Sequence, residues 1–133
     1  MKEQDKKILI KNCILKSGEA LSDAEYNLKD KRYSSALNRI YYAVFYSVMA
    51  LAYKEGFTTS KHSQLISWFN KKYIYEEKIF DPLLKDIYKH AYKQRQESDY
   101  NLIFLDAFSD ELVFKELENA KYFIDSVSKY LNN

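Results

Sequence analysis

An arginine near the end of a helical segment is the residue best suited to chemistry in this sequence. At about 100° per residue of an α-helix, Arg95 falls on the same face as Leu84, Tyr88 and Ala91, which the apolar pattern turns inward. A guanidinium keeps its proton at ordinary pH, so a partly buried one needs a carboxylate, carbonyls or a bound anion such as phosphate. Arg95 is therefore a candidate phosphate ligand.

Two interpretations of Arg95 remain open. In the structural one, it pairs with Asp99 one helical turn later, or extends to water beside the tyrosines. In the functional one, Arg95 contacts phosphate, Asp99 orients Arg95, and Tyr100 hydrogen-bonds to phosphate or base.

A second arginine stands beside two tyrosines near the start of another helical segment. Arg39 is followed by Tyr41 and Tyr42, and an arginine next to aromatic rings can position a phosphate while the rings stack on a base. Taken alone, this pattern is more often an exposed arginine with two packing tyrosines. Together with Arg95, it makes Arg39 and Tyr42 candidate ligand-binding residues.

Other common chemistries find no support. Two glycines cannot build a phosphate-binding loop, and His62 and His90 have no partner at metal-ligand spacing, so we expect no metal and no cofactor. His62 is interpreted as a polar residue of a first helical turn. Cys13 is interpreted as a small packing residue. The net charge of +2 is too small to argue for nucleic acid by itself.

The composition favours one helical domain over residues 1–133. Hydrophobic residues make up 47% of the chain, which is enough for one core, while two Gly and one Pro leave little turn chemistry for strands. The apolar stretch from Ile40 to Tyr53 is shorter than the roughly 20 residues of a membrane span. One cysteine and the lack of an apolar signal segment favour the cytoplasm.

Apolar periodicity and capping residues predict an all-α, up-and-down bundle of about five helices. Residues 99–108 are left open between a loop and a helical continuation. The most apolar helix, with two adjacent apolar rows, is expected at the centre. The expected helices run from about Gln4 to Leu28, from a cap at Ser34 to Lys54, from a cap at Thr59 or Ser60 to Lys72, from Asp81-Pro82 to Ser98, and from a cap at Ser109 to Leu131.

The chain resembles the prokaryotic HEPN domain family over nearly its whole length. The resemblance rests on the block from Tyr33 to Tyr46, on His62 after a short loop, on Arg95-x-x-x-Asp99-Tyr100, and on the apolar closing pattern of the last helix. It implies a compact helical bundle that forms homodimers, with the two sites meeting at the interface. It also implies a partner, because members commonly accompany a minimal nucleotidyltransferase, and some pairs act as toxin and antitoxin.

The chain differs at two motif positions from the active members of the family that it resembles. Those are metal-independent ribonucleases with an Arg, four intervening residues and a His, and the corresponding position here is Tyr100. The tyrosine that toxin members carry two places later corresponds to Leu102. An imidazole with a pKa near 6.5 can accept the 2′-hydroxyl proton at neutral pH, whereas a phenol, with an ordinary pKa of about 10, is mostly protonated there.

Three functions therefore remain open. The first is a partner of a minimal nucleotidyltransferase that binds nucleotide or RNA phosphate through Arg39, Tyr42, Arg95, Asp99 and Tyr100. The second is a metal-independent ribonuclease toxin in which Arg95 and Tyr100 are catalytic. The third is an oligomerisation module whose tyrosines serve only for packing.

Overall fold

The computed structural model describes the backbone of residues 1–133 and every side chain except those of Phe104 and Leu105. Over these residues the fold is all-α, as the sequence predicts, and no described helix is long and apolar enough to cross a membrane. The elements are α1 (Glu3–Lys29), α2 (Tyr33–Glu55), α3 (His62–Phe69), a π-helical turn η1 (Asn70–Glu76), α4 (Leu83–Tyr100), a 3-10 segment η2 (Leu102–Ala107) and α5 (Asp110–Leu131).

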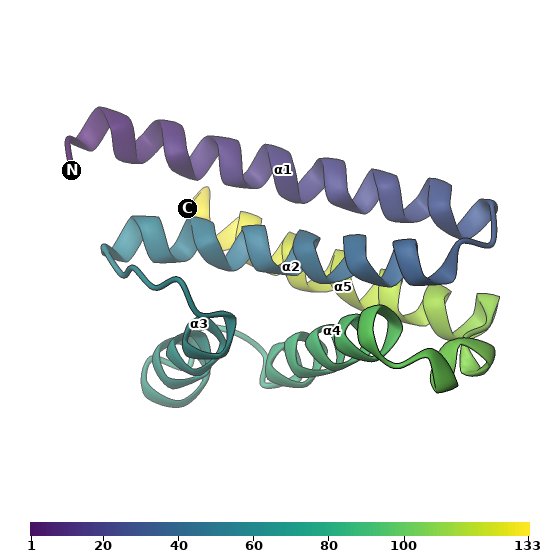
Figure 1. Cartoon of the computed structure of the whole chain (residues 1–133). Helices are drawn as coiled ribbons and strands as arrows, with labels where there is room; N and C mark the ends of the chain where they lie inside the picture. Colours follow the sequence, from purple (N-terminus) through teal and green to yellow (C-terminus); the bar gives the residue numbers. More distant parts are fainter.

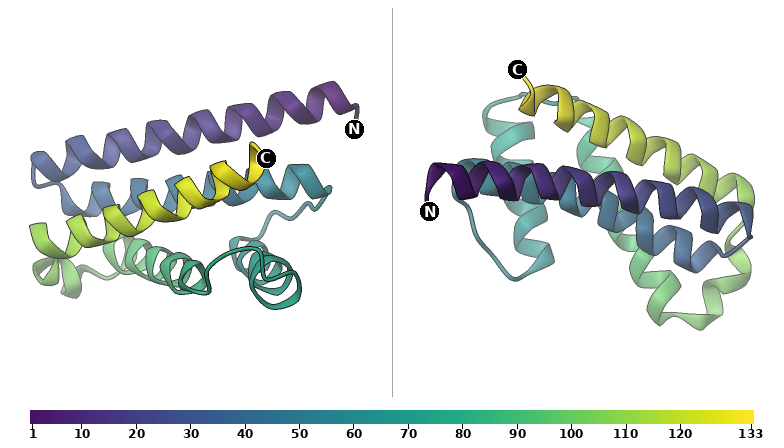
Figure 2. Two further views of the ribbon diagram at one scale, coloured as in Figure 1. Left: turned by 180° about the vertical axis from the view of Figure 1, so that it is seen from behind. Right: turned by 90° about the horizontal axis from the view of Figure 1, so that it is seen from above.

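The helices pack around α2. Helix α1 lies antiparallel along one side of α2, α5 runs beside both, and α4 packs against α2 from the other side (Figure 1). Helix α3 lies across the direction of α1 and α2, as the view from above shows (Figure 2). Both chain ends lie at the same end of the bundle, and the end of α4 and its connection to α5 lie at the opposite end (Figure 1).

The central position of α2 follows from its two apolar rows, as predicted. Nearly all of its inward side chains are fully buried, and Gly56, which follows its last residue as the C-cap, adopts a left-handed conformation with φ of 74°, which glycine tolerates without strain. The buried residues of α2 are Ala36, Leu37, Ile40, Tyr41, Ala43, Val44, Ser47, Val48, Ala50, Leu51 and Ala52. Because α2 is apolar on several sides, three other helices can cover it.

Aromatic rings fill the part of the core between α3, α4 and α5. Phe69 lies with its ring centroid 5.3 Å from that of Phe123, 5.7 Å from Tyr88 and 5.9 Å from Phe80. The pair with Phe80 is stacked, the pair with Phe123 is tilted and the pair with Tyr88 is edge-on, and such pairs contribute beyond the apolar area that they bury. This cluster fixes α4 against the bundle, and α4 carries Arg95.

The start of α5 agrees with the sequence-based prediction, whereas the starts of α2, α3 and α4 differ from it. The hydroxyl of Ser109 accepts a hydrogen bond from Leu112 N at 3.2 Å and caps α5, as predicted. The prediction that Ser34 caps α2 is wrong, because the helix already begins at Tyr33 and position 34 lies inside its first turn. Backbone hydrogen bonds from Lys31 N to Leu28 O and from Arg32 N to Asn27 O close the turn after α1, and Arg32 then takes the N-cap position of α2.

The other two starts shift by one or two residues. Asp81 Oδ1 accepts a hydrogen bond from Leu83 N at 2.9 Å, but the N-cap position of α4 is Pro82, so Pro82 precedes the helix instead of opening it. Thr59 accepts a hydrogen bond from Lys61 N at 3.1 Å and so shapes the turn before α3, which begins at His62. The open segment 99–108 divides between the end of α4 and η2.

Candidate functional site

Arg95 lies among three tyrosine rings. It projects from the last third of α4 toward the first half of α2, and its guanidinium carbon is 5.7 Å from the ring centroid of Tyr41, 5.6 Å from Tyr42 and 5.8 Å from Tyr100. The side chain is 17% exposed. Aromatic faces attract a cation but accept no conventional hydrogen bond, so the rings hold the guanidinium without satisfying its N–H groups.

The carboxylate of Asp99 pairs with Arg95 by charge but not by a directed hydrogen bond. Asp99 Oδ2 is 3.1 Å from Arg95 Nε, yet the N–H is not aimed at it, and Nε is buried without a hydrogen-bond partner among the described residues. The Nη atoms likewise make no hydrogen bond with a described residue, and they are not buried, so they reach solvent. The guanidinium therefore keeps donors available for a ligand.

Asn38 connects Arg39 to this pair. Arg39 donates from Nε and Nη2 to Asn38 Oδ1 at 3.1 and 2.8 Å, and Asn38 Nδ2 donates to Asp99 Oδ2 at 3.4 Å. The Arg39 guanidinium also lies 5.2 Å from the ring centroid of Tyr42. Two arginines that are far apart in sequence thus flank one tyrosine ring.

A polar recess of about 370 Å³ opens beside this network. It is lined from the end of α1 and the start of α2, with Asp99 contributed by α4. Arg39 and Asn38 line it as well. An anionic group entering the recess would meet the guanidinium of Arg39 and the carboxylate of Asp99. The positive charge of Arg95 beside Asp99 offsets the repulsion between that carboxylate and the anion.

Tyr100 marks the exposed rim of the site. Tyr100 is 73% exposed, and its ring lies beside the Arg95 guanidinium. The next apolar residues, Leu102 and Ile103, are 76% and 86% exposed. The candidate residues that the sequence suggested therefore lie in one connected group: Arg39, Tyr42, Arg95, Asp99 and Tyr100.

The sequence interpretation missed His62. Its ring stacks on Phe45 at a centroid distance of 4.7 Å and on Tyr41 at 5.6 Å, and its Nδ1 lies 2.5 Å from the Tyr41 hydroxyl. Burial lowers the pKa of His62, and the positive charge of Arg95 lowers it further. The spacing of His62 and Arg95 in the sequence does not predict that they are neighbours, because only the fold brings the start of α3 close to Arg95. Its placement directly after a short loop from the tyrosine-rich helix was the one available signal.

Cys13 lies buried in α1, apart from this group. Burial raises the pKa of its thiol to about 11, partly offset by Lys16. A thiol with such a pKa holds almost no thiolate at neutral pH, which agrees with its interpretation as a packing residue.

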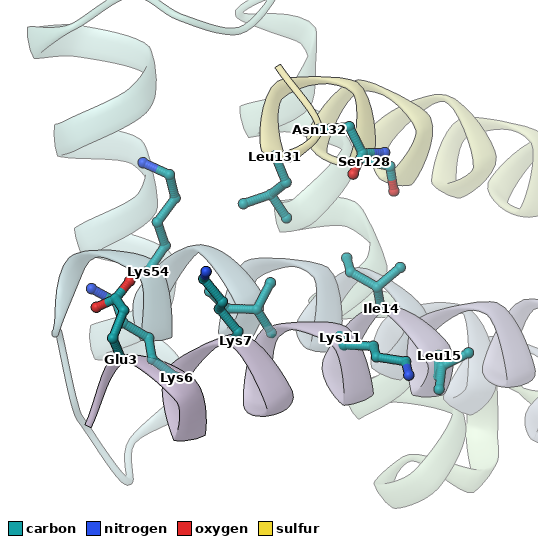
Figure 3. A pocket seen from close by; sticks show the side chains of 11 residues that line it. Glu3, Lys6, Lys7, Lys11, Ile14, Leu15, Lys54, Ser128, Leu131 and Asn132 are labelled. Carbon is teal, nitrogen blue, oxygen red and sulfur yellow. The ribbon is translucent and has the colours of Figure 1, made fainter. Parts of the chain in front are cut away.

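A larger hollow, of about 650 Å³, shares no lining residue with the Arg95 group. It lies between the first half of α1 and the last turn of α5, where Ile14 and Leu131 face each other and Lys7 and Lys54 extend beside them (Figure 3). It has no arginine and no aromatic ring among its lining residues. Size alone therefore does not mark a ligand site, and the available donors and the tyrosine rings distinguish the Arg95 group from this hollow.

Comparisons with known proteins agree with this helical arrangement. Residues 10–131 match the HEPN domain. A UPF0332 protein of Thermotoga maritima is 34% identical over 133 residues, covering all of this chain and 97% of the relative. Two proteins of Methanocaldococcus jannaschii, whose names mark them as candidate toxins, are each 29% identical and cover 92% and 85% of this chain and 81% of their own lengths. The chain belongs to the HEPN domain family.

Proposed function

We propose that this HEPN domain binds the phosphate of a nucleotide or of RNA through Arg95. The observation that carries the proposal is an arginine side chain, 17% exposed, whose guanidinium makes no directed hydrogen bond to a described residue although the Asp99 carboxylate lies 3.1 Å from Nε. A charge that is this well enclosed normally acquires directed hydrogen bonds, because each one to a charged group contributes about 1.5–3 kcal/mol. Two or three phosphate oxygens would supply the missing acceptors.

The remaining members of the group would complete the site. Asp99 would hold Arg95 in place by charge, and Arg39 would add a second cation next to Tyr42. Tyr100 would donate a hydrogen bond to phosphate or stack on a base, since its ring is exposed and adjacent to Arg95. Residues 1–133 would act as one domain.

The protein partner that we propose is a minimal nucleotidyltransferase, in a two-component system of the toxin–antitoxin type in the cytoplasm. The toxin names of the two M. jannaschii relatives support a toxin-like role. We also propose a homodimer. The exposure of Tyr100, Leu102 and Ile103 close together in the chain supports it, because monomeric proteins seldom leave large apolar side chains grouped at the surface.

A metal-independent ribonuclease toxin is the second candidate, and the toxin names of the same relatives agree with the toxin part of it. In that case Arg95 would stabilise the charged phosphorane and Tyr100 would contact the reacting phosphate. A third possibility, a plain oligomerisation module, would leave Arg95 without a ligand.

Direct titration separates these functions. The chain should bind a short single-stranded RNA or nucleoside monophosphates in fluorescence anisotropy or calorimetry, and the affinity should fall as salt is added. Cleavage of the RNA that persists in a metal chelator would select the ribonuclease. Binding without cleavage would select the non-catalytic partner. Failure to bind RNA, nucleotides or the purified nucleotidyltransferase would contradict the proposal and leave the oligomerisation module.

A further inference from the structure

His62 is fixed in orientation by the aromatic residues of α2. It is the first residue of α3, and its ring stacks on Phe45 with an interplanar angle of 17° and meets the Tyr42 ring edge-on at a centroid distance of 6.2 Å. The same Tyr42 ring lies 5.6 Å from the Arg95 guanidinium. His62 and Arg95 therefore adjoin one ring from different helices.

The hydroxyl of Tyr41 determines which nitrogen of His62 carries the proton. Tyr41 is fully buried, and burial with its tyrosine neighbours raises the pKa of this phenol far above its ordinary value. The hydroxyl thus stays protonated and needs an acceptor, and His62 Nδ1 at 2.5 Å is the one that the described residues provide. A neutral imidazole that accepts at Nδ1 carries its hydrogen on Nε2.

The surroundings also keep the ring uncharged. Arg95 is the charged side chain near it, and no carboxylate of the described residues forms an ion pair with His62 to stabilise an imidazolium. The titratable groups whose rings meet it are the phenols of Tyr41 and Tyr42. A neutral ring of this tautomer has no free basic nitrogen to offer to a substrate.

The Nε2–H remains available. It makes no hydrogen bond with a described residue, and it is not among the buried polar atoms that lack a partner, so it reaches solvent. Resting on the proposed phosphate site, we infer that His62 is a second anchor for the same ligand: its Nε2–H donates to a phosphate oxygen of a nucleotide or RNA held by Arg95. His62 is thus a hydrogen-bond donor in this site and not a general base.

Three variants test the inference with a short single-stranded RNA as the probe. In His62→Gln the amide nitrogen places an N–H where Nε2 lies but cannot act as a base at neutral pH. In His62→Asn the donor falls at the Nδ1 position, and His62→Ala has none. We expect His62→Gln to bind within about threefold of wild type and the other two variants to bind about tenfold more weakly, a loss typical of one hydrogen bond to a charged group. Equal loss in all three variants, or none in His62→Ala, would overturn the inference.

A second measurement does not depend on the ligand. Nitrogen-15 NMR of the free chain should show an unprotonated Nδ1 and a protonated Nε2 for His62, and this preference should weaken in Tyr41→Phe. A protonated Nδ1 in the wild type would overturn the inference even if RNA binds. If wild type has the expected tautomer but binds neither RNA nor nucleoside monophosphates, the proposed function fails, and the ligand role of His62 fails with it. Thermal unfolding of each variant confirms that it is folded.

Discussion

Arg95 and Asp99, one turn apart on α4, are joined by charge at 3.1 Å without a directed hydrogen bond. An i,i+4 pair of this kind stabilises an exposed helix by only about 0.2–0.5 kcal/mol, so it does not explain why an arginine is enclosed by three tyrosine rings. The two interpretations of Arg95 are compatible, since the carboxylate holds the side chain and leaves its other N–H groups available.

The first prediction concerns the effect of the Arg95 charge on the pKa of His62. Because burial and Arg95 together lower the pKa of His62, Arg95→Gln should raise that pKa toward its ordinary value. An NMR titration of the ring protons measures it, with His90→Asn used to assign the two imidazoles. Lys89→Gln, which removes a charge from the exposed face of the same helix, is the control and should move the pKa of His62 much less.

The same shift has a consequence for stability. A histidine with a lowered pKa in the folded state binds its proton more readily when unfolded, so the free energy of unfolding should decrease as the pH falls below about 6.5. The part of this decrease that depends on His62 should be smaller in Arg95→Gln. An equal decrease in the variant and in wild type would show that Arg95 does not act on His62.

The second prediction compares two serines at helix starts. Ser109→Ala removes the cap of α5 and should lower the free energy of unfolding by about 1 kcal/mol. Ser34→Ala should have little effect, because Ser34 does not cap α2. Urea unfolding followed by circular dichroism measures both. A larger decrease in the free energy of unfolding for Ser34→Ala than for Ser109→Ala would mean that Ser34 caps α2, as the sequence predicted.

The third prediction compares two buried tyrosines. The Tyr41 hydroxyl is hydrogen-bonded to His62, whereas the Tyr88 hydroxyl is buried with no partner among the described residues. Tyr41→Phe should therefore cost about 1 kcal/mol, while Tyr88→Phe should be neutral or stabilising because it removes an unpaired polar group. Chemical denaturation of the two variants provides the comparison. The reasoning fails if Tyr88→Phe is the more destabilising of the two.

The fourth prediction tests the proposed homodimer. Ile103→Asp should weaken self-association measured by analytical ultracentrifugation, because it places a charge in the exposed apolar group formed by Tyr100, Leu102 and Ile103 at the junction of α4 and η2. Tyr26→Asp, at a site on α1 that is 66% exposed, is the matched control and should have no such effect. A wild-type chain that sediments as a monomer at every concentration tested would contradict the dimer.

Local patterns were sufficient for much of the fold. The apolar rows of α2 and the cap at Ser109 depend on neighbouring residues, and the structure confirms both. The start of α2 was predicted wrongly because backbone hydrogen bonds close the turn after α1 and place Arg32, not Ser34, at the N-cap. For the site, the helical face of Arg95 and its distance from Asp99 follow from helix geometry alone. The position of His62 does not, because it depends on how α3 folds back against α2.

The most direct test of the account is the affinity of a short single-stranded RNA for wild type, Arg95→Ala and Lys89→Ala at one fixed salt concentration. Lys89 is an exposed cation on the same helix that lies outside the tyrosine group. We predict that Arg95→Ala weakens binding at least about tenfold, as expected for charge-assisted hydrogen bonds to phosphate, and that Lys89→Ala stays within about twofold of wild type. If Arg95→Ala is folded and binds the RNA as tightly as wild type, Arg95 is not the phosphate ligand.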